Sequence, residues 1–512
     1  MRIALAKVQD TAKGLTLAAI QYPVNIAYLA SVCLELEHEV EIWDFCVEPF
    51  TDEYISHKIK KFKPHLLGLS CVTPAIYFGN TIAQIAKKIN ENIFTVIGGV
   101  HIAALPVETM QEFPAFDLGV LVEAEDILPE IIKDLEAGRA PKNIRGTVYR
   151  ESGEIVVVPL LGQSMVNDGA GSKIDGVAYG KDKTVFREDD KIVLRNIGGY
   201  PDIEKIPFPN RSLVAHELYA NQHAVRGVSR KVWNVIEVDT SRGCPFQCTF
   251  CSVEKTHGRG VRFRSPDNVL REVEDCIKKY DTNFIVFNDS TFTFSPDRNR
   301  IRDIVTGLMR LGIKGYHLNG HVKTVDYELL KLLADTGCKK ITFGIESGSE
   351  RVLKKIKKSA TPQEIREAFS MAKRAKIPVV EGTFVLGSDI YETQEDFDAT
   401  IKLMKEIQPD TVGLGIISPF PGTIQYDELK KLGYLDNIGW DSFEIFSEEP
   451  PPWRIYNFSA RELADIRDNT LKSFYWNPKF ILKQLLKIRS FSELLYYAGM
   501  AKDFYRVVVK NK

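Results

Sequence analysis

The chain has 512 residues, of which 44% are hydrophobic and 26% charged, and its formal net charge is -1. This length exceeds what one ordinary hydrophobic core needs, so several domains are expected. The near-neutral charge excludes a general nucleic-acid binder, which needs a surplus of basic residues. No apolar run reaches the roughly 18 residues of a membrane span. Met1–Asp10 lacks the basic and apolar regions of a secretory signal, which favours a cytoplasmic protein.

The first 140 residues alternate strand-like and helix-like runs. Helix-like runs such as Ile82–Asn90 separate strands that are predicted at Arg2–Ala6, Glu39–Phe45, Leu66–Ser70, Phe94–Gly98 and Asp117–Val122. This rhythm is typical of βαβ units, so residues 1–140 are expected to form a Rossmann-like, doubly wound α/β domain. Ligands of such folds bind at the carboxyl ends of the strands. The residues that fall there include Ser70, Cys71, Val72, Thr73, Gly98, Gly99 and His101.

Residues 141–230 have a different pattern and are predicted to form a linker with a β-hairpin insertion. Two similar segments, Ile144–Val156 and Ile174–Val185, each favour a hairpin. A Gly/Ser-rich loop is predicted between them, within an insertion at 162–200. Pro201–Pro209 is a proline-punctuated connection.

Residues 231–425 return to the βα rhythm. Helices are predicted at Asn268–Lys279, Asp326–Asp335 and Pro362–Ala375, and strands at Asn234–Val238, Phe284–Phe287, Gly315–Leu318, Lys340–Ile345, Val379–Leu386 and Thr411–Ile416. Six such units indicate a partial (β/α)6 barrel of the TIM type. Residues 426–512 are expected to be a mainly helical extension, with helices at Arg461–Phe474 and Phe491–Arg506.

Three of the eight cysteines are clustered in the segment SRGCPFQCTFCS, and the other five are expected to be buried thiols. Cys244, Cys248 and Cys251 follow the first barrel strand, so they should lie at the catalytic end of the barrel. Three thiolates can bind three irons of a [4Fe–4S] cubane and leave the fourth iron open to a substrate. Zinc is the alternative, although structural zinc usually takes four protein ligands and no second cysteine pair follows. Cys276 and His257 are the nearest further candidates.

The spacing CxxxCxxC, with Phe250 before its last cysteine, resembles the radical S-adenosylmethionine (SAM) superfamily. FND at 287–289 resembles the strand-end motif that holds the SAM amino group. FGIESGSE at 343–350 resembles the motif that contacts ribose and carboxylate. TFVLGSDIYET at 383–393 resembles the motif near adenine, and SPFPGT at 418–423 resembles the end of the sixth unit. The resemblance implies SAM contacts from Phe250, Asn288, Asp289, Gly344, Glu346, Ser347, Phe384, Leu386 and Gly387.

The N-terminal segments YPVNIAYLAS, VIGGVHIAALPVE and VEAE resemble the cobalamin-binding domain of the B12-dependent class of that superfamily. The resemblance implies cobalamin contacts from Ser70, Cys71, Val72, Thr73, Gly98, Gly99, His101 and Glu123. In VEAE, Val122 and Ala124 replace the glycines of the usual GEGE. They are expected to add two side chains near the nucleotide tail of the cofactor.

The resemblance implies that the cluster cleaves SAM reductively to a 5′-deoxyadenosyl radical, and methylation of an unactivated carbon is the expected outcome. Cyclisation, oxidation or rearrangement without methyl transfer is an alternative, as is a radical SAM enzyme whose N-terminal domain is only a scaffold. A non-enzymatic metal-binding protein is the alternative of another class. The implied partners are a small-molecule, lipid or peptide substrate and an electron donor such as flavodoxin or ferredoxin. No motif marks a catalytic side chain beyond the cofactor sites.

Overall fold

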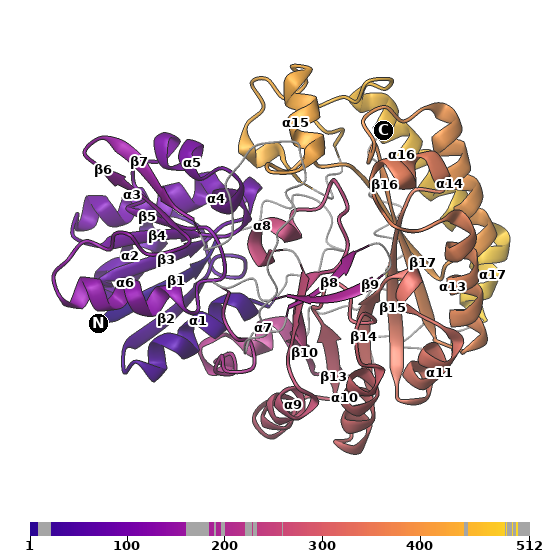
Figure 1. The fold of residues 1–512 in the computed structure, drawn as a ribbon, viewed down its shortest axis with the longest axis horizontal. Coiled ribbons are helices and arrows are strands. Elements are labelled where there is room, and N and C mark those ends of the chain that lie inside the picture. The colour runs from indigo at the N-terminus through magenta and orange to yellow at the C-terminus, as the bar shows by residue number, and fades with distance from the viewer. Residues whose placement is uncertain are drawn as a thin grey trace.

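The computed structural model places two α/β units side by side (Figure 1). It describes residues 1–8, 22–159, 184–188, 191–195, 200–220, 228, 233–258, 260–444, 449–486, 488, 494 and 498–499. None of the helices within these ranges is long and apolar enough to cross a membrane.

The N-terminal unit is built on a seven-stranded sheet of order β2-β1-β3-β4-β5-β6-β7. Its first five strands are parallel: β1 (Arg2–Lys7), β2 (Glu39–Asp44), β3 (Leu66–Ser70), β4 (Phe94–Gly98) and β5 (Leu118–Val120). The helices between and after them are α1 (Val24–Glu35), α2 (Asp52–Phe62), α3 (Ile76–Ile89), α4 (Val100–Ala104), α5 (Pro106–Glu112) and α6 (Ile127–Glu136), with the short turn η1 (Thr73–Ala75). Two apolar clusters bury the sheet. The expected doubly wound fold is confirmed.

The first predicted hairpin belongs to this sheet. It forms β6 (Thr147–Glu151) and β7 (Glu154–Val158), and β6 pairs antiparallel with β5. The sheet therefore continues past residue 140. An added antiparallel ribbon covers an edge strand whose backbone groups would otherwise be exposed.

The second unit is an open barrel of six parallel strands in the order β10-β13-β14-β15-β16-β17. These are β10 (Val235–Val238), β13 (Phe284–Phe287), β14 (Gly315–Gly320), β15 (Cys338–Glu346), β16 (Val379–Leu386) and β17 (Thr411–Ile416). The covering helices and turns are α9 (Pro266–Tyr280), α10 (Arg298–Arg310), η3 (Val322–Thr324), α11 (Tyr327–Asp335), α12 (Glu350–Lys355), α13 (Pro362–Arg374) and α14 (Gln394–Ile407). Buried residues on the helix side of the strands form the largest core. The expected partial barrel is confirmed.

A third, four-stranded sheet joins the cysteine segment to the insertion, in the order β11-β12-β8-β9. Its strands are β8 (Thr184–Glu188), β9 (Lys191–Arg195), β11 (Ser241–Cys244) and β12 (Gly260–Phe263). Strands β8 and β9 pair antiparallel, whereas the predicted hairpin at Ile174–Val185 falls largely outside the described residues. The predicted loop at 162–173 lies outside them too. Strand β8 also pairs with β12, and this pairing joins the two strands to the cysteine segment.

Short elements and a helical C-terminal segment complete the chain. They are η2 (Arg211–Leu213), α7 (His216–Ala220), α8 (Val253–His257), α15 (Ile424–Lys431), η4 (Trp440–Ser442), α16 (Ala460–Tyr475) and α17 (Pro478–Leu485). The predicted helix Arg461–Phe474 is confirmed as α16, whereas the predicted Phe491–Arg506 falls largely on residues outside the described ones. Between the two units, α8 packs against α4, and η4 packs against η1. Figure 1 shows α8 between the N-terminal sheet and the barrel.

Candidate active site at the domain interface

The three clustered cysteines lie on a loop that is held at both ends and in its middle. Cys244 ends strand β11, and the Cys251 N–H donates to the Cys248 carbonyl oxygen at 3.2 Å. Thr249 between them donates its N–H to the Ile356 carbonyl oxygen at 3.0 Å and accepts a hydrogen bond from Gln425 Nε2 at 2.7 Å. Elements that are distant in sequence therefore fix the shape of this loop.

A buried ion pair lies beside the cysteines. Lys358 Nζ donates to Glu346 Oε1 at 2.8 Å, and side-chain exposures of 9% and 10% shield this pair from water. Burial alone would lower the pKa of Lys358, but the Glu346 carboxylate and the nearby Cys248 thiol raise it above its ordinary value. Burial raises the pKa of Cys248 to about 12, and Lys358 opposes that rise. The sequence did not mark Lys358, because it is one of several lysines after α12 and only its burial sets it apart.

The backbone around Glu346 is shaped for this pair. Glu346 has a φ of 69°, a left-handed conformation that non-glycine residues adopt only when their surroundings enforce it. The ladder between β15 and β16 is irregular between Gly344 and Glu346. A Cβ at Gly344 would lie 2.6 Å from Glu346 Oε1 and 2.9 Å from Lys358 Nζ. Glycine at position 344 therefore leaves the space that the ion pair occupies.

Asp289 is engaged within the protein. Its carboxylate accepts hydrogen bonds from the Thr240 N–H at 2.8 Å, from the Thr240 hydroxyl at 2.7 Å and from the Ser241 hydroxyl. Its neighbour Asn288 donates from Nδ2 to Glu237 Oε2 at 2.9 Å. The carboxylate that resembled a holder of the SAM amino group thus fastens the end of β13 to the start of β11.

The remaining predicted SAM residues divide by the direction of their side chains. Ser347 is 1% exposed and contacts the Thr400 hydroxyl at 3.1 Å. Phe384 and Leu386 are buried in the core between sheet and helices, and Phe250 packs against that core. Gly387 follows β16 with a φ of 78°. From positions 384 and 386, only the backbone can face a ligand inside the barrel.

At the strand ends of the N-terminal unit, the adjacent residues Gly98 and Gly99 differ in the space around them. A Cβ built at Gly98 would meet only the Leu69 carbonyl oxygen, at 4.0 Å, whereas one at Gly99 would lie 2.3 Å from the Cys71 carbonyl oxygen. Gly99 also has a φ of 106°, so the turn itself requires glycine there. Ser70 accepts a hydrogen bond from Asn25 Nδ2 at 3.1 Å.

The neighbouring predicted residues differ in exposure. Val72 is 44% exposed, whereas Cys71 and Thr73 are each 1% exposed. His101 is also 1% exposed, with its ring centroid 4.9 Å from that of Trp440. Within the described ranges no hydrogen-bond partner contacts His101 Nδ1, and burial lowers the pKa of this ring to about 4. His101 is thus a neutral, buried imidazole.

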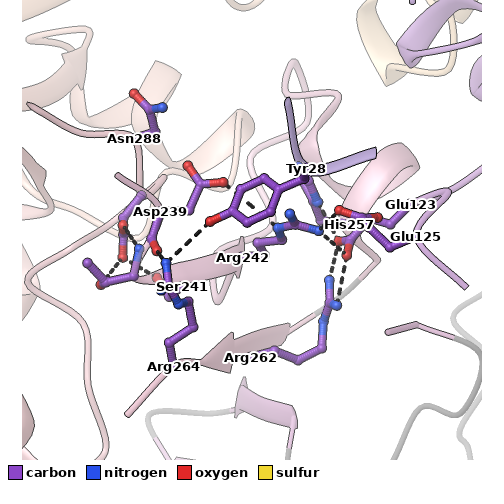
Figure 2. Close-up of polar contacts among 12 residues, drawn as sticks. Tyr28, Glu123, Glu125, Asp239, Ser241, Arg242, His257, Arg262, Arg264 and Asn288 are labelled. Carbon is purple, nitrogen blue, oxygen red and sulfur yellow. Dashed lines mark hydrogen bonds and ion pairs between the residues drawn. The ribbon is translucent and has the colours of Figure 1, made fainter. Parts of the chain in front are cut away.

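The side chains of the segment VEAE are engaged within the protein. Val122 packs against both apolar clusters of the N-terminal unit, and Ala124 packs against one of them. Both side chains therefore pack inside the N-terminal unit. The carboxylate of Glu123 points to the cysteine segment, where Arg242 of β11, Arg262 of β12 and His257 of α8 bind it (Figure 2). The structure therefore gives Glu123 partners other than the expected cofactor.

The donor set fits an iron–sulfur cluster. In the part of the chain that the structure describes, no three His, Cys, Asp or Glu side chains, the three loop cysteines included, form a group around a single metal ion, so the fit is judged from the ligand type and the surrounding groups. Neither candidate for a fourth zinc ligand is free, since His257 Nδ1 contacts Glu123 Oε1 at 2.7 Å and Cys276 of α9 is buried in the core. Three thiols on one loop, beside a buried ammonium that offsets negative charge, match the ligand set of a [4Fe–4S] cluster.

Two family models match the chain. The model of the radical SAM superfamily matches residues 238–404, and that of the B12 binding domain matches residues 12–132. The uncharacterized methyltransferase PH0819 of Pyrococcus horikoshii is 30% identical over 485 residues, which cover 94% of each chain. The anaerobic magnesium-protoporphyrin IX monomethyl ester cyclase of Rubrivivax gelatinosus is 24% identical, over 98% of this chain and 81% of the cyclase.

Solved structures share the arrangement of the two units. The radical SAM methyltransferase TsrM of Kitasatospora setae, with tryptophan and a SAM analogue bound, has a TM-score of 0.63 at 17% identity. That match covers 84% of this chain and 76% of TsrM. The cobalamin-dependent radical enzyme OxsB, with aqua-cobalamin and SAM bound, has a TM-score of 0.68 at 15% identity, over 99% of this chain and 71% of OxsB. At these identities the likeness shows the fold.

Proposed function

This chain belongs to the radical SAM superfamily, in the class with an N-terminal B12-binding domain, and from that membership we propose that it methylates an unactivated carbon. The observation that carries the proposal is the direct contact between the cysteine strand β11 and the Glu123 segment at the strand ends of the N-terminal unit. A methyl group can pass only between groups that are held close together. When bound, the cluster, SAM and cobalamin supply the electron, the radical and the methyl group.

We propose that Cys244, Cys248 and Cys251 each hold one iron, and that Glu346 and Lys358 bind SAM at the remaining corner. This pair offers one negative and one positive group to the methionine end of SAM, which also carries both charges. The pair is buried, and charged groups interact more strongly where water is excluded. Asp289 would act indirectly, by holding the loop that carries Cys244.

The reductant and the substrate follow from the same proposal. Ferredoxins of the plant type reach potentials of about -400 mV, so a flavodoxin or ferredoxin in the cytoplasm is the electron donor that we propose. The substrate would be a small molecule, lipid or peptide that enters between the two units.

A second candidate is radical cyclisation or oxidation without methyl transfer. The likeness to the cyclase of Rubrivivax gelatinosus over nearly the whole chain favours it. The two candidates differ in their products, because methyl transfer releases S-adenosylhomocysteine in addition to 5′-deoxyadenosine.

Cobalamin binding is tested at Gly98, where an added side chain would have room. The folded wild-type protein should bind hydroxocobalamin with a Kd well below 1 mM, which corresponds to about 4 kcal/mol. Gly98→Leu should fold, since a Cβ there meets nothing closer than 4.0 Å, yet its side chain should occupy the corrin site. We expect at least a roughly tenfold weaker Kd in an absorbance titration, against the conservative Gly98→Ala as control. A wild-type Kd weaker than about 1 mM would make the domain a scaffold, and unchanged binding by Gly98→Leu would place the corrin elsewhere.

A further inference from the structure

Five charged or titratable side chains meet between the two units, and we call them the interface cluster. It consists of Glu123 and Glu125 of the N-terminal unit and Arg242, His257 and Arg262 of the cysteine segment. Figure 2 shows Glu123 and Glu125 facing the arginines. Side-chain exposures of the two glutamates and two arginines are between 5% and 9%, so water has little access to these pairs.

The interface cluster is saturated and balanced in charge. Arg242 Nη1 donates to Glu123 Oε2 at 2.9 Å and to Glu125 Oε1 at 2.7 Å. Arg262 donates to both oxygens of Glu123, with Nη1 at 3.0 Å from Oε2. Burial would raise the pKa of Glu123, but Arg242, His257 and Arg262 hold it well below its usual range. Two carboxylates thus face two guanidinium groups, with the His257 ring at the exposed side.

Arg242 also belongs to the strand that ends in a predicted cluster ligand. Side chains two residues apart in a strand point to the same face, so Arg242 and Cys244 share one face of β11. Gly243 between them presses on β12, where a Cβ would lie 2.0 Å from the Gly260 carbonyl oxygen. The pairing of β11 with β12, which we call the short ladder, therefore determines the position of Cys244.

The ladder is held from two sides. On the barrel side, Asp289 binds Thr240 and Ser241. On the other side, the Arg242 guanidinium lies between the Glu123 and Glu125 carboxylates and 5.0 Å from the centroid of the Tyr28 ring of α1. Its Nε also lies 3.9 Å from Asp239 Oδ2. The side chain of Arg242 is thus enclosed by groups from both units.

We propose that Arg242 is a positioning residue through which the N-terminal unit fixes Cys244, and with it one corner of the cluster, relative to the strand ends of that unit. This inference rests on the proposed function, because it requires that Cys244 binds iron. Arg242 suits the role because its planar guanidinium bonds both carboxylates through Nη1 while its Nε lies 3.9 Å from Asp239 Oδ2, whereas a lysine ammonium is a point charge on a flexible stem. Glu123 and Glu125 therefore act on the cluster through Arg242.

The test compares Arg242→Lys with Tyr28→Phe in anaerobically reconstituted full-length protein. Arg242→Lys keeps the charge and loses the planar guanidinium, including the Nε group beside Asp239. Tyr28→Phe removes a hydrogen bond of the same interface, from Arg264 Nη1 at 3.2 Å, and keeps the ring beside Arg242. Iron content, thermal unfolding, the electron paramagnetic resonance spectrum of the reduced cluster with SAM, and the rate of 5′-deoxyadenosine release are measured on each.

Arg242→Lys is expected to retain four irons but to show a shifted spectrum with SAM and a roughly tenfold slower release. Tyr28→Phe is expected to match the wild type. Glu125→Gln, which weakens only the second bond to Arg242, repeats the test with the same expected direction if Arg242→Lys does not fold. A wild-type spectrum and rate in both Arg242→Lys and Glu125→Gln would overturn the proposal, as would an equal change in Tyr28→Phe. Wild-type protein without iron would instead overturn the proposed function, and this inference with it.

Discussion

Replacing Cys244, Cys248 and Cys251 together with alanine is expected to abolish iron binding and SAM cleavage. The segment at 241–252 contains three of the eight cysteines, and they are the cluster ligands that we propose. Without thiolates the cubane has no protein ligands, so the roughly 400-nm absorbance of the reconstituted protein should disappear. The rate should fall at least about 10⁶-fold, because the uncatalysed reference lies that far below typical enzymes.

Cys276→Ala is the matched control for this triple variant. Its thiol is 1% exposed in the core of the barrel unit, away from the loop, and it was the candidate fourth ligand for zinc. The control should retain four irons and the absorbance, with a modest loss of thermal stability from the small cavity. Four irons per chain in the triple variant would show that the cluster is held elsewhere. Loss of iron in Cys276→Ala, with the fold intact, would also contradict the assignment.

Glu346→Ala should have the second largest effect. It leaves the Lys358 ammonium in a site that is 9% exposed without its carboxylate partner. Breaking a buried ion pair by removing one partner costs about 3–5 kcal/mol of folding free energy. SAM binding should weaken as well, because the proposed site loses its negative group. Iron content should not change, since none of the three thiols is altered.

Two further variants separate these effects. Glu346→Gln keeps the shape and the acceptor oxygen, so its free energy of unfolding should fall less while SAM affinity still falls. Glu346→Ala combined with Lys358→Met removes both charges, and it should recover stability without recovering SAM affinity. Denaturant titration and equilibrium binding of SAM to the reconstituted protein measure the two quantities. Unchanged SAM affinity in all three variants would show that Glu346 and Lys358 do not bind SAM.

The sequence predicted the strands well where they are buried on both faces. The predicted Leu66–Ser70, Phe94–Gly98, Val379–Leu386 and Thr411–Ile416 agree with β3, β4, β16 and β17. Strands of a parallel sheet under helices are nearly continuous apolar runs, so their limits are visible locally. The helix predicted at Pro362–Ala375 is confirmed as α13, where Thr361 and Glu364 form a capping box.

The side-chain partners could not be predicted in this way. Glu123 and Arg242 are 119 residues apart, and their ion pair exists only because two separate units meet. Lys358 becomes distinctive only through burial beside Glu346. Asp289 and Phe384 fall in recognisable motifs, but the fold turns one carboxylate to Thr240 and one ring into the core. Motif spacing identifies which residues lie near a site, whereas packing decides which of them face it.

Product analysis of the reconstituted enzyme tests the central claim most directly. Protein with four irons per chain is incubated with SAM, dithionite and candidate substrates, with and without hydroxocobalamin, and both nucleoside products are quantified. A cobalamin-dependent radical methyltransferase should release 5′-deoxyadenosine in the complete reaction, with S-adenosylhomocysteine formed only when cobalamin is present. 5′-Deoxyadenosine without S-adenosylhomocysteine would favour radical chemistry without methyl transfer. The absence of both products from protein with an intact cluster would contradict the account.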